Sequence, residues 1–127
     1  MKARLLSAFG YQGDAMNLPV ADVDAALPYY VDKMGFEIVE RTDEPHKTAV
    51  LERDGILIGL GENGGDPEQD GCAFHTDDIL ALRDEFMGVG LEKIGETKEE
   101  VRKDGSRFKV FFVVAPDGLC YWFGQRI

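Results

Sequence analysis

The chain has 127 residues, of which 44% are hydrophobic and 30% charged, enough for a folded domain without disulfide or metal staples. Its 14 basic and 24 acidic residues give a formal charge of -10 at pH 7, which argues against nucleic acid and anionic membranes as partners, because both are negative. No apolar run approaches the roughly 18 residues of a membrane span. The start of the chain lacks the apolar stretch of a secretory signal, and the two cysteines form neither a CxxC pair nor a disulfide framework. These features predict a cytoplasmic protein.

The first predicted element is an extended segment over residues 16–20. A helix then begins at Asp22, whose carboxylate can accept hydrogen bonds from the free N–H groups of the first turn. Apolar residues recur every three or four positions along this helix, but Pro28 inside it predicts a lost hydrogen bond or a kink. Three strands follow, at residues 37–40, 49–53 and 56–60, and Asp54-Gly55 predicts a tight hairpin between the last two.

The same order of elements recurs in the second half of the chain. Asp78 aligns with Asp22, and the residues around it predict a strand, a helix and three more strands, at 72–76, 79–89, 92–96, 108–114 and 119–123. The glycine-rich linker, residues 61–71, is expected to be only a connection and not a phosphate-binding loop, because no GK[ST] follows it and no helix begins at its end. Residues 96–109 are expected to form a projecting hairpin or mobile arm. We therefore predict an α+β fold. One domain over residues 1–127 would contain two βαβββ modules, 14–63 and 70–126, whose curved mixed sheets form a cleft.

Four stretches of the sequence resemble the vicinal-oxygen-chelate superfamily, which includes glyoxalase I, extradiol dioxygenases, fosfomycin-resistance enzymes and bleomycin-resistance proteins. They are LPVADVDAALPYYVDKMGFEIVER, LERDGILIGL, CAFHTDDILALRDEF and FFVVAPDGLCYWF. The resemblance covers nearly the whole chain from Asp14 onward. It implies that the sheets of the two modules form a cleft, and that the protein is a homodimer that builds each cleft at a subunit junction.

The resemblance also implies positions for metal ligands, because catalytic members hold a metal ion with four strand residues inside the cleft. In this chain those positions are Ala15, Gly59, Gly71 and Trp122, and none of them has a side chain that can ligate a metal. We therefore expect no metal, no other cofactor and no catalytic residue. Among the named groups, this pattern points to the metal-free bleomycin-resistance proteins.

Strand alternation assigns further side chains to the cleft, since residues two apart share a face. Trp122 offers a surface for stacking a planar ligand or a cation, although an aromatic plug that fills the cleft is the alternative. His75 and Asn17 offer polar groups that can orient a ligand, but a strand-end histidine and a structural hydrogen bond are the alternatives. Leu57 and Phe111 are predicted apolar walls, and Cys120 fits a buried small hydrophobe better than a nucleophile.

Together these features predict metal-independent binding or sequestration of a small cationic or aromatic molecule, of the bleomycin-resistance type, with no bond broken. The charge of -10 favours a cationic ligand. One alternative is an enzyme, a glyoxalase-like lyase or isomerase or a dioxygenase, with metal ligands that the sequence does not identify. The other is a protein whose cleft is filled by its own side chains and which binds a partner.

Overall fold

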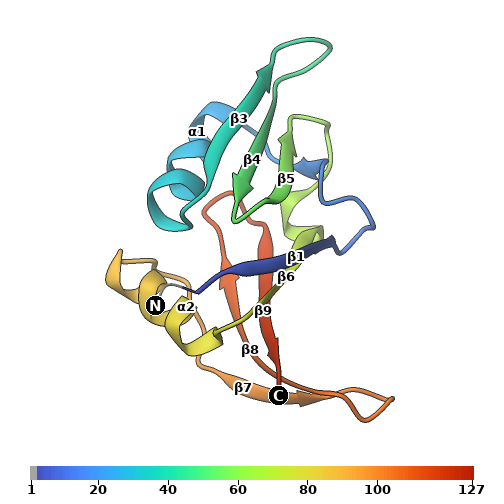
Figure 1. Cartoon of the computed structure of the whole chain (residues 1–127). Helices are drawn as coiled ribbons and strands as arrows, with labels where there is room; N and C mark the ends of the chain where they lie inside the picture. Colours follow the sequence, from blue (N-terminus) through green and yellow to red (C-terminus); the bar gives the residue numbers. More distant parts are fainter. Residues whose placement is uncertain (1–2) are drawn as a thin grey trace.

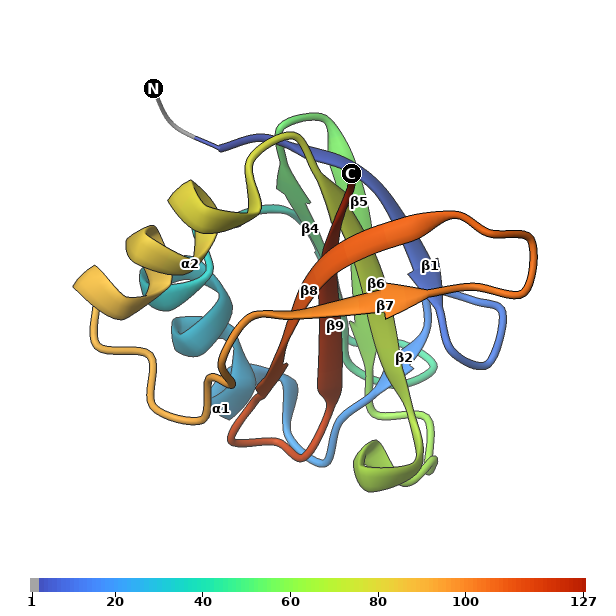
Figure 2. The ribbon, with the colours of Figure 1, turned by 90° about the horizontal axis from the view of Figure 1, so that it is seen from below.

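Two β-sheets form the body of the protein, and its two α-helices lie together on one side of them (Figure 1, Figure 2). The computed structural model describes residues 3–127. The strands are β1 (Leu5–Gly10), β2 (Leu18–Pro19), β3 (Glu37–Thr42), β4 (Thr48–Arg53), β5 (Ile56–Gly61), β6 (Gly71–Thr76), β7 (Lys98–Val101), β8 (Arg107–Val114) and β9 (Cys120–Arg126). The helical segments are α1 (Val23–Pro28), the π-helical turn η1 (Tyr29–Lys33), the 3₁₀ turn η2 (Pro67–Gln69) and α2 (Ile79–Gly88).

Both sheets are mixed. The first module supplies a four-stranded sheet in the order β2-β5-β4-β3, in which β2 runs parallel to β5 and the other neighbours are antiparallel. The second module supplies β6, β9, β8 and β7 of a five-stranded sheet in the same relative order, again with one parallel pair, β6 and β9. This repeated order confirms the α+β class and the paired βαβββ architecture predicted from the sequence.

The N-terminal strand β1 was not predicted. It lies antiparallel to β6 at the edge of the five-stranded sheet, so a segment that precedes the first module extends the sheet of the second. Of the strand predicted over 16–20, only Leu18 and Pro19 form a strand, β2, and the residues just before it pass close to β5. There the N–H of Gly59 donates to the carbonyl of Ala15 at 2.8 Å.

The strand predicted over residues 92–96 is wrong. In that segment Ile94 makes only an isolated bridge to Val113, and β7 begins later. The turn around Asp104 sets where β7 lies, because it pairs Val101 with Arg107, and the strand extends back from that pair to Lys98. The β7–β8 hairpin itself was predicted within residues 96–109 and projects from the body (Figure 2). The linker also contains a short helical turn, η2, that was not predicted.

Both helices begin as the sequence predicts. The carboxylates of Asp22 and Asp78 each accept a hydrogen bond from a backbone N–H of the first turn, at 3.1 Å. Pro28 ends α1 because it lacks the N–H that would continue the hydrogen-bond ladder. The chain then widens into η1, where the N–H of Met34 donates to the carbonyl of Tyr29 at 3.2 Å. No helix within residues 3–127 is long and apolar enough to cross a membrane.

The core lies between the helices and the sheets, and stacked rings form its centre. Phe123 lies between Phe74 and Phe111, with ring centroids 5.1 and 5.2 Å away, and Phe86 of α2 packs edge-on against it at 5.3 Å. Phe111 is fully buried in this cluster. The prediction that Phe111 forms a wall of the ligand cleft is therefore wrong. Its side chain points toward the helices, and that of Phe112 points to the opposite face.

Buried polar contacts join the two modules. Arg53 of β4 is 6% exposed, and its guanidinium forms a bidentate ion pair with Glu85 of α2 at 2.7 and 2.8 Å. The same guanidinium donates to the carbonyl oxygen of Met34 at 2.7 Å. The hydroxyl of Tyr30 in η1 donates to the carboxylate of Asp117, between β8 and β9, at 2.7 Å. The Arg53–Glu85 and Tyr30–Asp117 contacts each bridge one module to the other, and the bond to Met34 holds the guanidinium within the first module.

Candidate ligand-binding site

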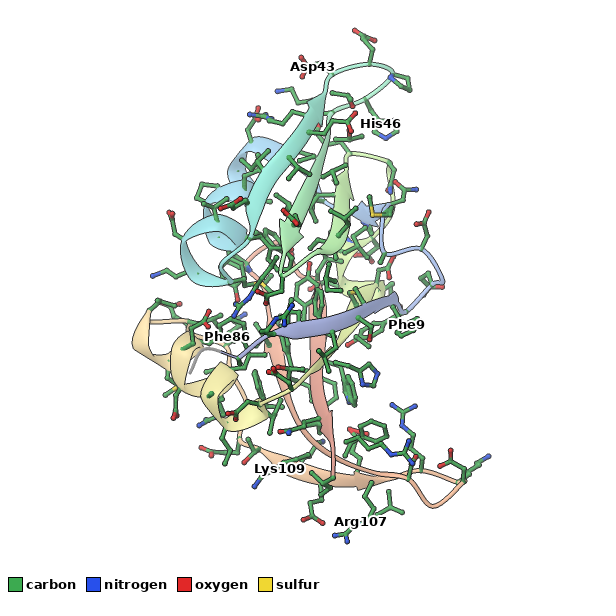
Figure 3. All side chains as sticks on the ribbon, in the orientation of Figure 1. Phe9, Asp43, His46, Phe86, Arg107 and Lys109 are labelled. Atoms are coloured by element: carbon green, nitrogen blue, oxygen red, sulfur yellow. The ribbon has the colours of Figure 1, made fainter. Side chains whose placement is uncertain are left out.

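Aromatic side chains cluster on the face of the five-stranded sheet that points away from the helices. Strand register places Phe9 of β1, Ala73 of β6, Trp122 of β9 and Phe112 of β8 in one row across the sheet. Phe9 is 63% exposed and lies at the end of β1 away from α2 (Figure 3). We call this cluster the aromatic wall; its members are Phe9, His75, Phe108, Phe112 and Trp122.

Trp122 and His75 lie at the centre of the aromatic wall. Their ring centroids are 5.2 Å apart, and Phe108 packs edge-on against both, at 5.6 Å from His75 and 5.8 Å from Trp122. Burial lowers the pKa of His75 below its ordinary value of 6.5, and the nearby guanidinium of Arg102 lowers it further. The imidazole is therefore neutral at pH 7, where it can donate one hydrogen bond and accept another. The fold thus brings together two of the residues predicted to bind a ligand.

The β7–β8 hairpin covers one end of the aromatic wall. Glu100 accepts a hydrogen bond from the indole Nε1 of Trp122 at 3.1 Å. The guanidinium carbon of Arg102 lies 4.6 Å from the ring centre of Phe108 and 5.5 Å from that of Trp122. Lys98 Nζ lies 5.0 Å from the ring centre of Phe112. Trp122 is consequently only 6% exposed, so a ligand reaches its ring only when side chains of the hairpin move.

The positions that the resemblance assigns to metal ligands do not fit a metal. A β-carbon on Gly59 would lie 2.1 Å from the carbonyl oxygen of Met16, and one on Gly71 would lie 1.8 Å from that of Cys120. Neither position can carry a donor side chain unless the backbone moves. Across residues 3–127, no three His, Cys, Asp or Glu side chains gather closely enough to hold a metal ion.

The remaining predicted ligand-binding residues are dispersed. Cys120 is partly exposed and precedes Trp122 by two positions on the same strand, so it adjoins the aromatic wall. Asn17 lies just before β2, and its side-chain and backbone oxygens accept hydrogen bonds from Asn63 Nδ2 at 2.9 and 3.1 Å. Leu57 of β5 is 45% exposed. Leu57 lies in the four-stranded sheet and Asn17 directly precedes it, so both are on other elements than the strands that carry Trp122 and His75.

Several residues of the site were not predicted. Phe112 could have been found from the sequence. Phe112 and Trp122 lie five residues before and five residues after Asp117, so a hairpin that turns at Asp117 places them opposite each other. Arg102 and Glu100 had no such signal, because they reach the indole only through the way the β7–β8 hairpin crosses the sheet. Phe9 was missed because its strand pairs with a segment remote in sequence.

A protein-family comparison assigns the chain. The family model of the Glyoxalase/Bleomycin resistance protein/Dioxygenase superfamily matches residues 13–119. The chain belongs to this superfamily. No functionally curated protein matches the sequence.

The solved structures that are similar to this superfamily member include a virulence protein and two proteins that bind antibiotics. A virulence protein from Salmonella typhimurium is 20% identical, with a TM-score of 0.69 over 90% of this chain and 95% of that one. A bleomycin-binding protein, solved in complex with bleomycin, is 23% identical, with a TM-score of 0.66 over 87% and 95%. An antibiotic-binding protein from Streptomyces sp. CB03234 is 17% identical, with a TM-score of 0.69 over 88% and 93%. At such identities the similarity establishes the fold alone.

Proposed function

We propose that this protein binds a small aromatic or cationic molecule on the aromatic wall, without a metal ion and without breaking a bond. The observation that carries the proposal is the position of Trp122 and His75, whose rings meet on the face of the sheet away from the helices, beside the β7–β8 hairpin and apart from the main core. Aromatic faces bind planar rings by stacking and bind cations through the ring quadrupole.

The charge of the chain and two similar structures support the same class of ligand. A net charge of -10 attracts cations to the protein surface. Two proteins that share the fold are described as binding bleomycin and binding an antibiotic. We extend that kind of role, the capture of a small molecule, to this chain.

Proflavine, a planar aromatic cation, is expected to bind the wild-type protein, and Trp122→Leu is expected to weaken this binding about tenfold, because it removes the ring on which proflavine stacks. Isothermal titration calorimetry measures the affinity, and Trp122→Phe, which keeps a smaller ring, should fall in between. The affinity is expected to be unchanged in EDTA. Equal binding by wild type and Trp122→Leu, or binding that requires an added divalent ion, would contradict the proposal.

We also propose a cytoplasmic homodimer. β1 is an edge strand, and its apolar side chains Leu6 and Phe9 are 56% and 63% exposed. An exposed apolar edge favours pairing with another chain. Sedimentation velocity is expected to give the mass of two chains for the wild type and to shift toward one chain for Leu6→Lys. A single monomeric species at every concentration tested would overturn the homodimer.

A further inference from the structure

The guanidinium of Arg102 occupies the centre of the proposed site. It lies over the rings of Phe108 and Trp122, at 4.6 and 5.5 Å from their centres. Arg102 belongs to the turn of the β7–β8 hairpin, where its N–H donates to the carbonyl of Ser106 at 2.8 Å. The residue is exposed, and within residues 3–127 its guanidinium forms no ion pair. Its place over the two rings is therefore held by cation–π contacts and not by a carboxylate.

A carboxylate lies beside the same rings. Glu100 is partly buried and is held in place by the hydrogen bond from Trp122 Nε1, at 3.1 Å. A cation on the face of Trp122 would meet both the ring quadrupole and a nearby negative charge. Aromatic faces combined with a carboxylate favour an organic cation, and the planar guanidinium of Arg102 shows that a flat cation fits against these two rings.

We propose that Arg102 is a resident competitor for this site: it holds the place of a planar organic cation, such as an amidinium or a protonated heteroaromatic ring, which binds by displacing it. This inference rests on the proposed function and narrows its ligand class. Displacement exchanges one cation–π contact for another and breaks no ion pair, so the side chain of Arg102 yields at small cost. An anionic ligand would instead pair with Arg102 where it lies.

Arg102→Ala is expected to bind proflavine about three- to thirtyfold more tightly than the wild type, because the variant lacks the competing cation–π contacts. Arg107→Ala is the matched control. It removes the same charge from the same hairpin, but Arg107 is exposed, points away from the body of the protein (Figure 3) and pairs with Glu99 at 2.7 Å. Its affinity for proflavine should stay within about twofold of the wild type, because exposed charges at a distance are screened.

The protonation of His75 gives a second readout, by NMR titration of its imidazole. Phe9, Phe108 and Trp122 pack against this ring, and Arg102 is the charged group that lowers its pKa in addition to burial. Arg102→Ala is therefore expected to raise the pKa of His75. Saturation of that variant with proflavine is expected to lower the pKa again, because a cation returns to the same place.

The outcomes separate this inference from the proposed function. Failure of proflavine to bind either wild type or Arg102→Ala would count against both. Binding to the wild type with equal or weaker binding to Arg102→Ala would overturn the competitor role and leave the proposed function standing. Acridine carboxylate, a planar anion, tests the opposite charge. If it binds more tightly than proflavine and loses this binding in Arg102→Ala, Arg102 is a direct ligand contact and the inference is wrong.

Discussion

Phe111→Ala is expected to lower the free energy of unfolding by about 3–5 kcal/mol, the range for deleting a buried phenylalanine ring. Phe111 is fully buried, stacks on Phe123 at 5.2 Å and meets Phe86 edge-on at 6.1 Å. Alanine would leave a cavity in the middle of this cluster. Urea unfolding followed by circular dichroism measures the change.

Phe112→Ala is the matched control for this prediction, because it removes the same ring from the next residue of β8. Phe112 lies on the opposite face of the sheet and is only partly buried. Its loss is expected to cost less than about 2 kcal/mol, in proportion to the smaller apolar area that it buries, and to weaken proflavine binding instead. Equal destabilisation by the two substitutions, or a loss of binding confined to Phe111→Ala, would contradict the assignment of faces.

Arg53→Met is expected to destabilise the fold by about 3–5 kcal/mol, because it leaves a largely buried carboxylate without its partner. The side chains of Arg53 and Glu85 are 5% and 20% exposed, and their two hydrogen bonds tie β4 to α2. The double variant Arg53→Met with Glu85→Met should recover much of this loss, since it no longer buries an unpaired charge. Urea unfolding of the single variant, the double variant and the wild type provides the comparison.

An exposed ion pair serves as the control for Arg53. Arg107 and Glu99 form a bond of similar length, 2.7 Å, but their side chains are 54% and 55% exposed. Arg107→Met is therefore expected to change the free energy of unfolding by less than about 1 kcal/mol, because water screens and replaces a surface pair. If Arg53→Met were equally mild, the buried pair would not be what fixes the two modules together.

The elements that the sequence predicted well are those decided by neighbouring residues. Asp22 and Asp78 cap the helices through hydrogen bonds within the first turn. Pro28 ends α1 because it lacks an N–H. Asp54 and Gly55 form the two-residue turn between β4 and β5. The prediction of a strand over 92–96 was wrong because the residues around Ile94 do not determine how far the pairing of β7 with β8 extends from the hairpin turn.

The predictions of site residues also depended on which relations between residues were used. The resemblance implied that Gly71 and Trp122 face the cleft, and alternation along β6 then placed His75 on the same face as Gly71, because side chains two apart in a strand share a face. Phe111 was predicted on the wrong face because the register across the β8–β9 turn was not used, and that register is what distinguishes the two neighbouring phenylalanines of β8.

The sequence by itself determined the α+β class, the two-module order, the helix starts and the lack of metal-ligating side chains at the four positions implied by the resemblance, because each depends on residue type and local spacing. Only the tertiary structure decided that β1 joins the second module's sheet and that Arg102 and Glu100 lie against Trp122. Those outcomes depend on contacts between segments remote in sequence. Their free energy comes from packing and desolvation that no single segment contains.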